Sequence, residues 1–172
     1  MDSEGGSGRW YEPGDTVKVA VTLNGEDQVL ETEPRKTLAD TLRAAGHTGT
    51  HLGCEHGVCG SCTVLVDGRP VRSCLMLAVQ VEGRHVETVE GLAFGDELHP
   101  IQRAFHEGGA LQCGFCTPGF LMLATGVLRE DPRADAELIC ERMTSNVCRC
   151  TGGVPITAAV LAAQRRAQGV EE

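Results

Sequence analysis

The sequence predicts an α+β protein in which a small mixed β-sheet, crossed by one helix, precedes an all-α part with four helices. Three observations lead to this prediction. Residues 16–23 alternate between apolar and polar or small side chains, which is the period of a half-buried strand. After Gly91 the apolar residues recur at helical spacing instead. Finally, eight of the nine cysteines form two groups of four with different spacings, so the two halves are not copies of one unit.

Residues 15–90 are expected to form the sheet domain. The dipeptide Asn24-Gly25 predicts a tight hairpin between the strand at 16–23 and a returning strand at 28–32. Thr37 suits the N-cap of a short helix, residues 38–45, which Gly46 would end. Further strands are expected at three places: 63–66, 71–77 and 86–89.

Residues 91–172 are expected to form the helical domain. The first helix, at 100–107, would bury Ile101, Ala104 and Phe105 on one face. Thr117-Pro118 resembles a cap followed by a first helical residue, and Asp135 can cap the next helix. The remaining helices are expected at 120–129, 136–144 and 155–166.

Composition and charge limit the class of protein. The 172 residues carry a formal net charge of −9, which argues against non-specific nucleic-acid binding. Residues 1–14 are polar and Gly-rich, so we expect a flexible tail without the apolar stretch of a secretory signal. No apolar run reaches the length of a membrane span. We therefore expect a cytoplasmic protein with reduced thiols.

The first cysteine group has the spacing of an iron–sulfur site. Four thiolates are the ligand count of a 2Fe–2S cluster, and C-x4-C-x2-C followed by a lone Cys is the plant-type ferredoxin pattern. Zinc sites with four cysteines more often use two short pairs. Interleaved glycines would let the backbone turn its N–H groups toward the sulfurs. The expected ligands are Cys54, Cys59, Cys62 and Cys74.

The second group consists of a C-x2-C pair and a C-x-C pair: Cys113, Cys116, Cys148 and Cys150. Two antiparallel helices would bring these pairs together at one end of the helical part. The spacing alone leaves an iron–sulfur cluster, a zinc site and a redox-active C-x2-C pair open. The remaining cysteine, Cys140, is expected to be a buried free thiol within a helix.

Three segments of the chain resemble the 2Fe–2S small subunits of molybdenum hydroxylases, a family that includes xanthine dehydrogenase, aldehyde oxidoreductase and carbon monoxide dehydrogenase. They are C-E-H-G-V-C-G-S-C-T-V at 54–64, L-Q-C-G-F-C-T-P-G at 111–119 and N-V-C-R-C-T-G at 146–152. The similarity runs from about residue 17 to residue 163. Ser145 and residues 153–155 depart from the common pattern, whereas all eight cysteines are kept.

The resemblance implies a plant-ferredoxin-like β-grasp domain that holds the distal cluster on the first cysteine group. It likewise implies a four-helix domain that holds the proximal cluster on the second. Gln112 and Cys150 match positions that contact a molybdopterin cofactor (cytosine dinucleotide) in a large subunit, and a medium subunit would bind FAD. The implied assembly is a heterotrimer, and in this family two such heterotrimers usually associate into a dimer.

The function that follows is electron transfer within an oxidoreductase complex, from the molybdenum centre through two 2Fe–2S clusters to FAD. No catalytic site is expected in this chain itself. The alternative is a free-standing two-cluster carrier that docks transiently, and a third reading is a zinc-stabilised interaction module. His56, inside the first cysteine loop, is expected to be a partly exposed loop residue.

Overall fold

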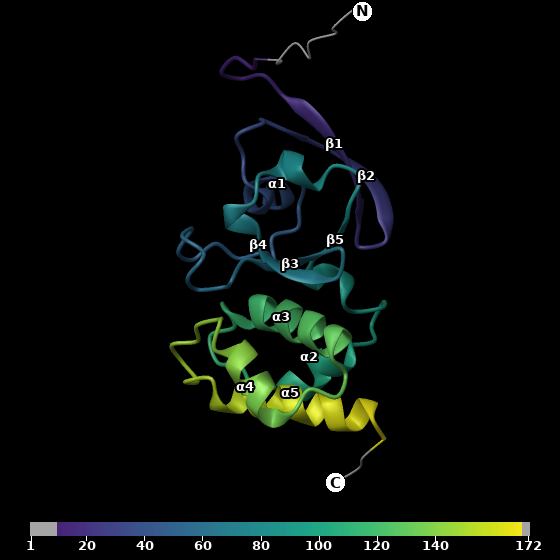
Figure 1. Cartoon of the computed structure of the whole chain (residues 1–172), viewed down its shortest axis with the longest axis vertical. Helices are drawn as coiled ribbons and strands as arrows, with labels where there is room; N and C mark the ends of the chain where they lie inside the picture. Colours follow the sequence, from purple (N-terminus) through teal and green to yellow (C-terminus); the bar gives the residue numbers. More distant parts are fainter. Residues whose placement is uncertain (1–9, 170–172) are drawn as a thin grey trace, which may run out of the picture.

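The structure is a computed structural model that describes residues 10–169. The flexible tail expected at 1–14 therefore lies mostly outside the described residues. Within them, a β-sheet part and a helical part follow each other along the chain, as Figure 1 shows from purple to yellow. The predicted α+β class is confirmed, because a mixed five-stranded sheet is combined with five α-helices in this part of the chain.

The hairpin at the start of the sheet forms as predicted. Strands β1 (Val17–Leu23) and β2 (Glu26–Thr32) pair antiparallel, with Leu23 opposite Glu26. The two turn residues, Asn24 and Gly25, have φ angles of 52° and 86°. Positive φ at both positions is what a two-residue turn needs to match the twist of the strands.

The remaining strands complete a sheet with the order β2-β1-β5-β3-β4. They are β3 (Thr63–Val66), β4 (Arg69–Arg72) and β5 (His85–Glu87). Strand β5 runs parallel to β1 and antiparallel to β3, which makes the sheet mixed. The strand expected at 71–77 is wrong in its bounds, because the tight turn at Asp67-Gly68 starts β4 at Arg69 and a short 3-10 helix, Ser73–Leu75, follows it.

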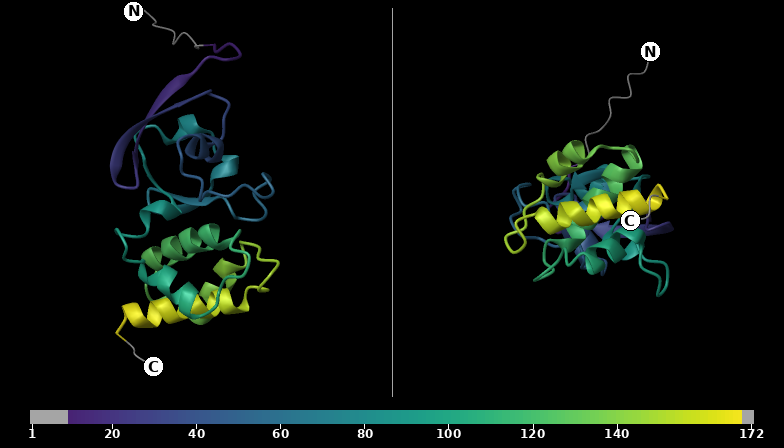
Figure 2. Two further views of the ribbon diagram at one scale, coloured as in Figure 1. Left: turned by 180° about the vertical axis from the view of Figure 1, so that it is seen from behind. Right: turned by 90° about the horizontal axis from the view of Figure 1, so that it is seen from below.

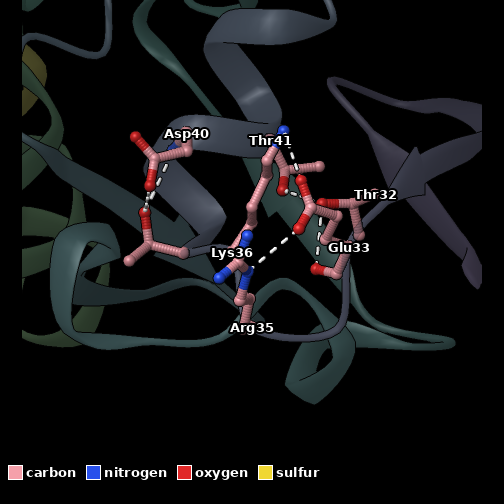
Figure 3. Close-up of polar contacts among 7 residues, drawn as sticks. Thr32, Glu33, Arg35, Lys36, Asp40 and Thr41 are labelled. Carbon is pink, nitrogen blue, oxygen red and sulfur yellow. Dashed lines mark hydrogen bonds and ion pairs between the residues drawn. The ribbon is translucent and has the colours of Figure 1, made fainter. Parts of the chain in front are cut away.

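Helix α1 (Leu38–Ala44) lies across one face of the sheet, with Leu38 and Leu42 in the same apolar cluster as the inward side chains of the strands. The predicted cap is present, since the hydroxyl of Thr37 accepts a hydrogen bond from the Asp40 N–H at 3.1 Å. Figure 3 shows how the helix is tied to the end of β2: the hydroxyls of Thr32 and Thr41 lie 2.7 Å apart in the interior.

Four helices form the second part: α2 (Pro100–Glu107), α3 (Thr117–Glu130), α4 (Ala136–Met143) and α5 (Val154–Ala167). The buried face of α2 is the predicted one, and Asp135 caps α4 through the Leu138 N–H at 2.8 Å. Thr117 differs from the prediction. It is the first residue of α3 rather than its cap, because Cys116 already has helical backbone angles.

Helix α3 packs directly on the sheet, opposite α1 (Figures 1 and 2). Every residue of β3 is buried, since Val64 and Val66 join the cluster under α1 while Leu65 joins the helical core. Gly126 makes this approach possible, because a Cβ at that position would overlap Pro70 and come within 2.9 Å of Leu65. The helical part and the sheet therefore share a packed boundary, and the cysteine loops lie beside it.

Candidate metal centres

The first cysteine group lies on an irregular loop and on the short helix that follows β4. Cys54 and Cys59 are half-buried on the loop, and Cys62 stands just before β3. Cys74 lies within the 3-10 helix, where the turn of β4 returns it toward the loop. Cys62 and Cys74 are only 2% and 7% exposed. The sheet therefore provides two buried thiols and the loop two that are nearer the surface.

Backbone N–H groups point at the sulfurs of this group. The N–H groups of His56 and Cys59 donate to Cys54 Sγ at 3.4 and 3.3 Å. Hydrogen bonds from the Cys59 and His56 backbones lower the pKa of Cys54 to about 6. Burial, by contrast, raises the pKa of Cys74 to about 11. A metal would have to displace the proton of Cys74, whereas Cys54 readily provides a thiolate.

The loop that carries Cys54 and Cys59 contains glycine at two positions where a larger residue would be strained. Gly57 and Gly60 have φ angles of 76° and 73°. A Cβ on Gly60 would overlap the side chain of Asn146, which comes from the helical part. Glycine is therefore required at Gly60 both by the backbone angle and by the close approach of the second cysteine group.

The second cysteine group is assembled from the ends of two helices. Cys113 and Cys116 precede α3, and Cys148 and Cys150 follow α4. Cys113 and Cys150 are exposed, while Cys116 and Cys148 are half-buried. Burial raises the pKa of Cys116 to about 12, and the neighbouring Cys148 thiol adds to the shift. Two thiols of this group are therefore partly shielded from solvent by the protein, and the other two face solvent.

Thr151 contacts the sulfur of Cys148 twice. Its backbone N–H lies 3.4 Å and its hydroxyl 3.0 Å from Cys148 Sγ. Although burial works in the opposite direction, these hydrogen bonds lower the pKa of Cys148. They are the kind of donor that stabilises negative charge on a metal-bound sulfur.

Within each group the thiols influence one another's pKa. The largest of these influences join four pairs: Cys54 with Cys59, Cys62 with Cys74, Cys113 with Cys150, and Cys116 with Cys148. Weaker charge interactions also link Cys74 with Cys54, Cys116 with Cys113, and Cys150 with Cys148. Each group thus offers four neighbouring thiols, which is the ligand count of one 2Fe–2S cluster.

The two cysteine loops are in direct contact. The N–H of Val147 donates to the Cys59 carbonyl at 2.9 Å, and the Asn146 amide donates to the Gly60 carbonyl at 3.2 Å. The ring of His51 stacks on Phe115, with ring centres 4.9 Å apart. These contacts join residues from opposite halves of the chain, so the two groups are neighbours within one molecule.

The other residues singled out from the sequence lie in different surroundings. Gln112 is exposed beside Cys113, and His56 is exposed on the first loop, as expected. The expectation for Cys140 is wrong: its side chain is exposed, because the inward positions of α4 are taken by Ile139 and Met143. It borders a cavity of about 590 Å³ that also includes Cys148 and Val154.

The sequence analysis included Asn146, Val147 and Thr151 in the N-V-C-R-C-T-G segment but assigned them no role in the site. Their position next to the C-x-C pair was a further signal, since residues adjacent to ligands often donate hydrogen bonds to them. Among the described residues, helices long and apolar enough to cross a membrane are absent.

Comparisons with known proteins agree with the geometry. The family model described as "2Fe-2S iron-sulfur cluster binding domain" matches residues 21–93, and that described as "[2Fe-2S] binding domain" matches residues 88–161. The nicotine 6-hydroxylase small subunit of Paenarthrobacter nicotinovorans is 51% identical over 87% of this chain and 90% of its own length. The caffeine dehydrogenase subunit gamma of Pseudomonas sp. (strain CBB1) is 52% identical over 78% and 83%.

A solved structure has the same fold. A chain of quinoline 2-oxidoreductase from Pseudomonas putida 86 superposes with a TM-score of 0.84 at 48% identity, covering 91% of this chain and 99% of that one. Matching iron–sulfur domains over both halves, together with these full-length relatives, disfavour the free-standing carrier. The chain therefore belongs to the family of 2Fe–2S small subunits of molybdenum hydroxylases, which are electron-transfer subunits of oxidoreductase complexes.

Proposed function

We propose that each cysteine group holds one 2Fe–2S cluster and that electrons pass through the chain from the second group to the first. The proposed ligands of the distal cluster are Cys54, Cys59, Cys62 and Cys74, and those of the proximal cluster are Cys113, Cys116, Cys148 and Cys150. The observation that supports this most strongly is that N–H and hydroxyl donors point at a cysteine sulfur in each group, Cys54 in the first and Cys148 in the second.

The chain's own residues would hold and tune these centres. One-electron chemistry is supplied by the clusters when they are bound. The backbone N–H groups around Cys54 and the hydroxyl of Thr151 would stabilise negative charge on the sulfurs. The buried pair Cys62 and Cys74 would keep water from the inner side of the distal cluster.

We further propose that the exposed side of the second group faces a large subunit that binds molybdopterin cytosine dinucleotide. Gln112, Cys113 and Cys150 are exposed there, so a partner can contact all three. The loop that carries Cys54 and Cys59, here called the distal loop, would face a medium subunit with FAD. Val58 and Leu75 beside it are 66% and 64% exposed. Exposed apolar side chains next to a redox centre favour a permanent protein partner.

The domain boundary near residue 90, the cytoplasmic location and the dimer of heterotrimers are parts of the same proposal. The relatives are named as subunits, and this supports a multi-subunit complex for this chain too. A boundary near residue 90 would fall between β5 and α2.

Affinity purification through a tag on this chain, from the organism that makes it, tests the proposal. We expect two further chains to co-purify, with molybdenum and flavin in amounts that match the iron–sulfur chain. Sizing of the complex tests the dimer of heterotrimers separately. A chain that carries iron but purifies alone would instead support the free carrier.

A further inference from the structure

Arg72 connects the two cysteine loops. It ends β4, two residues before Cys74, and its guanidinium makes three hydrogen bonds to three different parts of the chain. Nε donates to the Gly57 carbonyl of the distal loop at 3.4 Å, and Nη1 donates to the Thr63 hydroxyl at 2.6 Å. Nη2 donates to the carbonyl of Ser145 at 2.6 Å, across the boundary in the helical part.

Each of these contacts is linked to a residue of the candidate centres. Hydrogen bonding from the Gly57 backbone acts to lower the pKa of Cys74, against the effect of burial. Thr63 links Arg72 to Gly60, because its hydroxyl accepts from Arg72 and donates to the Gly60 carbonyl at 2.6 Å. Ser145 begins the segment 145–147, whose next two residues also bind the distal loop and which leads directly to Cys148. Arg72 thus binds both the distal loop, at Gly57, and the segment 145–147, at Ser145.

The charge of Arg72 has no carboxylate partner. All three of its hydrogen bonds go to uncharged oxygens, and none of the ion pairs formed among residues 10–169 includes it. Glu130 and Glu141 border the same cavity of about 490 Å³ without pairing with it. A half-buried cation is normally compensated by a nearby negative charge. A cluster bound by four thiolates would supply that charge.

We propose that Arg72 is a positioning residue for electron transfer, which fixes the distal loop against segment 145–147 and supplies the positive charge that stabilises the reduced distal cluster. This inference rests on the proposed function, because it requires a cluster in each cysteine group. Arginine is needed for the first role, since its planar fork reaches three acceptors at once, whereas lysine offers a single charged nitrogen. The second role needs only the charge.

Three variants of the intact complex separate these roles: Arg72→Gln, Arg72→Lys and the control Arg69→Gln. Arg69 lies on the same strand, is exposed and carries the same charge. Two quantities are measured by EPR: the midpoint potential of each 2Fe–2S signal and the spin–spin splitting between the two reduced clusters, which depends on their separation.

We expect Arg72→Gln to shift the distal potential downward and to reduce the splitting. Arg72→Lys should restore the potential toward that of the wild type but not the splitting. Arg69→Gln should change neither quantity. Wild-type values in Arg72→Gln, or changes equal to those of Arg69→Gln, would overturn the proposal.

A fourth variant covers the case in which the Arg72→Gln complex loses its iron. Thr63→Val removes the hydroxyl that joins Arg72 to Gly60 and leaves the charge in place. We expect it to reduce the splitting without the full shift in potential. An unchanged splitting in both Thr63→Val and Arg72→Lys would overturn the positioning role. If the wild-type complex itself gave no 2Fe–2S signal, the proposed function would fail rather than the role of Arg72.

Discussion

The backbone N–H of Val147 donates a 2.9 Å hydrogen bond to the carbonyl oxygen of Cys59. Val147 is covalently bonded to Cys148, so one hydrogen bond joins a residue of the first cysteine group to a neighbour of the second. The remaining steps between the two sulfurs are covalent bonds within Cys59, Val147 and Cys148. We expect electrons to pass between the proposed clusters along this connection.

The hydrogen bond can be removed without losing a buried side chain, because Val147 is 52% exposed. Val147→Pro deletes the N–H donor, whereas Val147→Ala keeps it and serves as the control. We expect slower electron transfer between the clusters in the proline variant only, measured by rapid-freeze EPR after mixing with substrate. Loss of the hydrogen bond should also lower stability by about 1 kcal/mol. Equal transfer rates in the two variants would show that this route is not used.

Replacement of a ligand should remove one cluster and leave the other. Cys113→Ser is expected to lose about half of the iron and the proximal EPR signal, and with them turnover of the complex. Cys140→Ser is the matched control, since Cys140 is exposed on α4 and belongs to neither group. Iron analysis and EPR of both variants provide the test. Full activity in Cys113→Ser would refute the idea of a two-cluster relay.

The hydroxyl of Thr151 should tune the proximal centre. Thr151→Val removes the 3.0 Å hydrogen bond to Cys148 Sγ but keeps the size of the side chain. Because donors to a ligand sulfur stabilise the reduced cluster, the proximal midpoint potential should fall while the distal one stays constant. Thr157→Val, on α5, serves as a control for a lost hydroxyl. A redox titration in which both threonine variants match the wild type would contradict this role.

His99 should make stability depend on pH. Its Nδ1 accepts the Ile101 N–H at the start of α2, and burial, aided by the cation of Arg129, lowers its pKa below the usual value of 6.5. The folded state therefore disfavours protonation of His99. Its contribution to stability is present above pH 6.5 and is lost as the pH falls from there toward the lowered folded-state pKa.

His99→Asn can still cap the helix but does not titrate. The difference in Tm between wild type and His99→Asn should be constant above about pH 7. Below about pH 6.5 the Tm of the wild type should fall relative to that of His99→Asn. A difference that stays constant from pH 7.5 to 5.5 would rule out His99 as the titrating group.

Local sequence patterns were sufficient for most of the fold. Period-two alternation gave β1, the pair Asn24-Gly25 gave its hairpin, and the cap at Asp135 gave α4. The strand expected at 71–77 was wrong in its bounds, because apolar residues in a short 3-10 helix and in a short strand cannot be told apart by periodicity.

The cysteine groups could be recognised from their spacing, but the contact between them could not. The hydrogen bonds of Asn146 and Arg72 join residues more than 70 positions apart. No local pattern encodes such pairs, because they depend on how α3 packs on β3. Cys140 illustrates the same limit: its exposure follows from which face of α4 turns inward.

The most direct test of the account is EPR of the dithionite-reduced complex purified from its host, with metal analysis of the same sample. The account predicts two distinct 2Fe–2S signals of equal intensity, iron sufficient for two clusters per chain, and molybdenum in the co-purified large subunit. Zinc in place of iron, with no EPR signal from this chain, would contradict it.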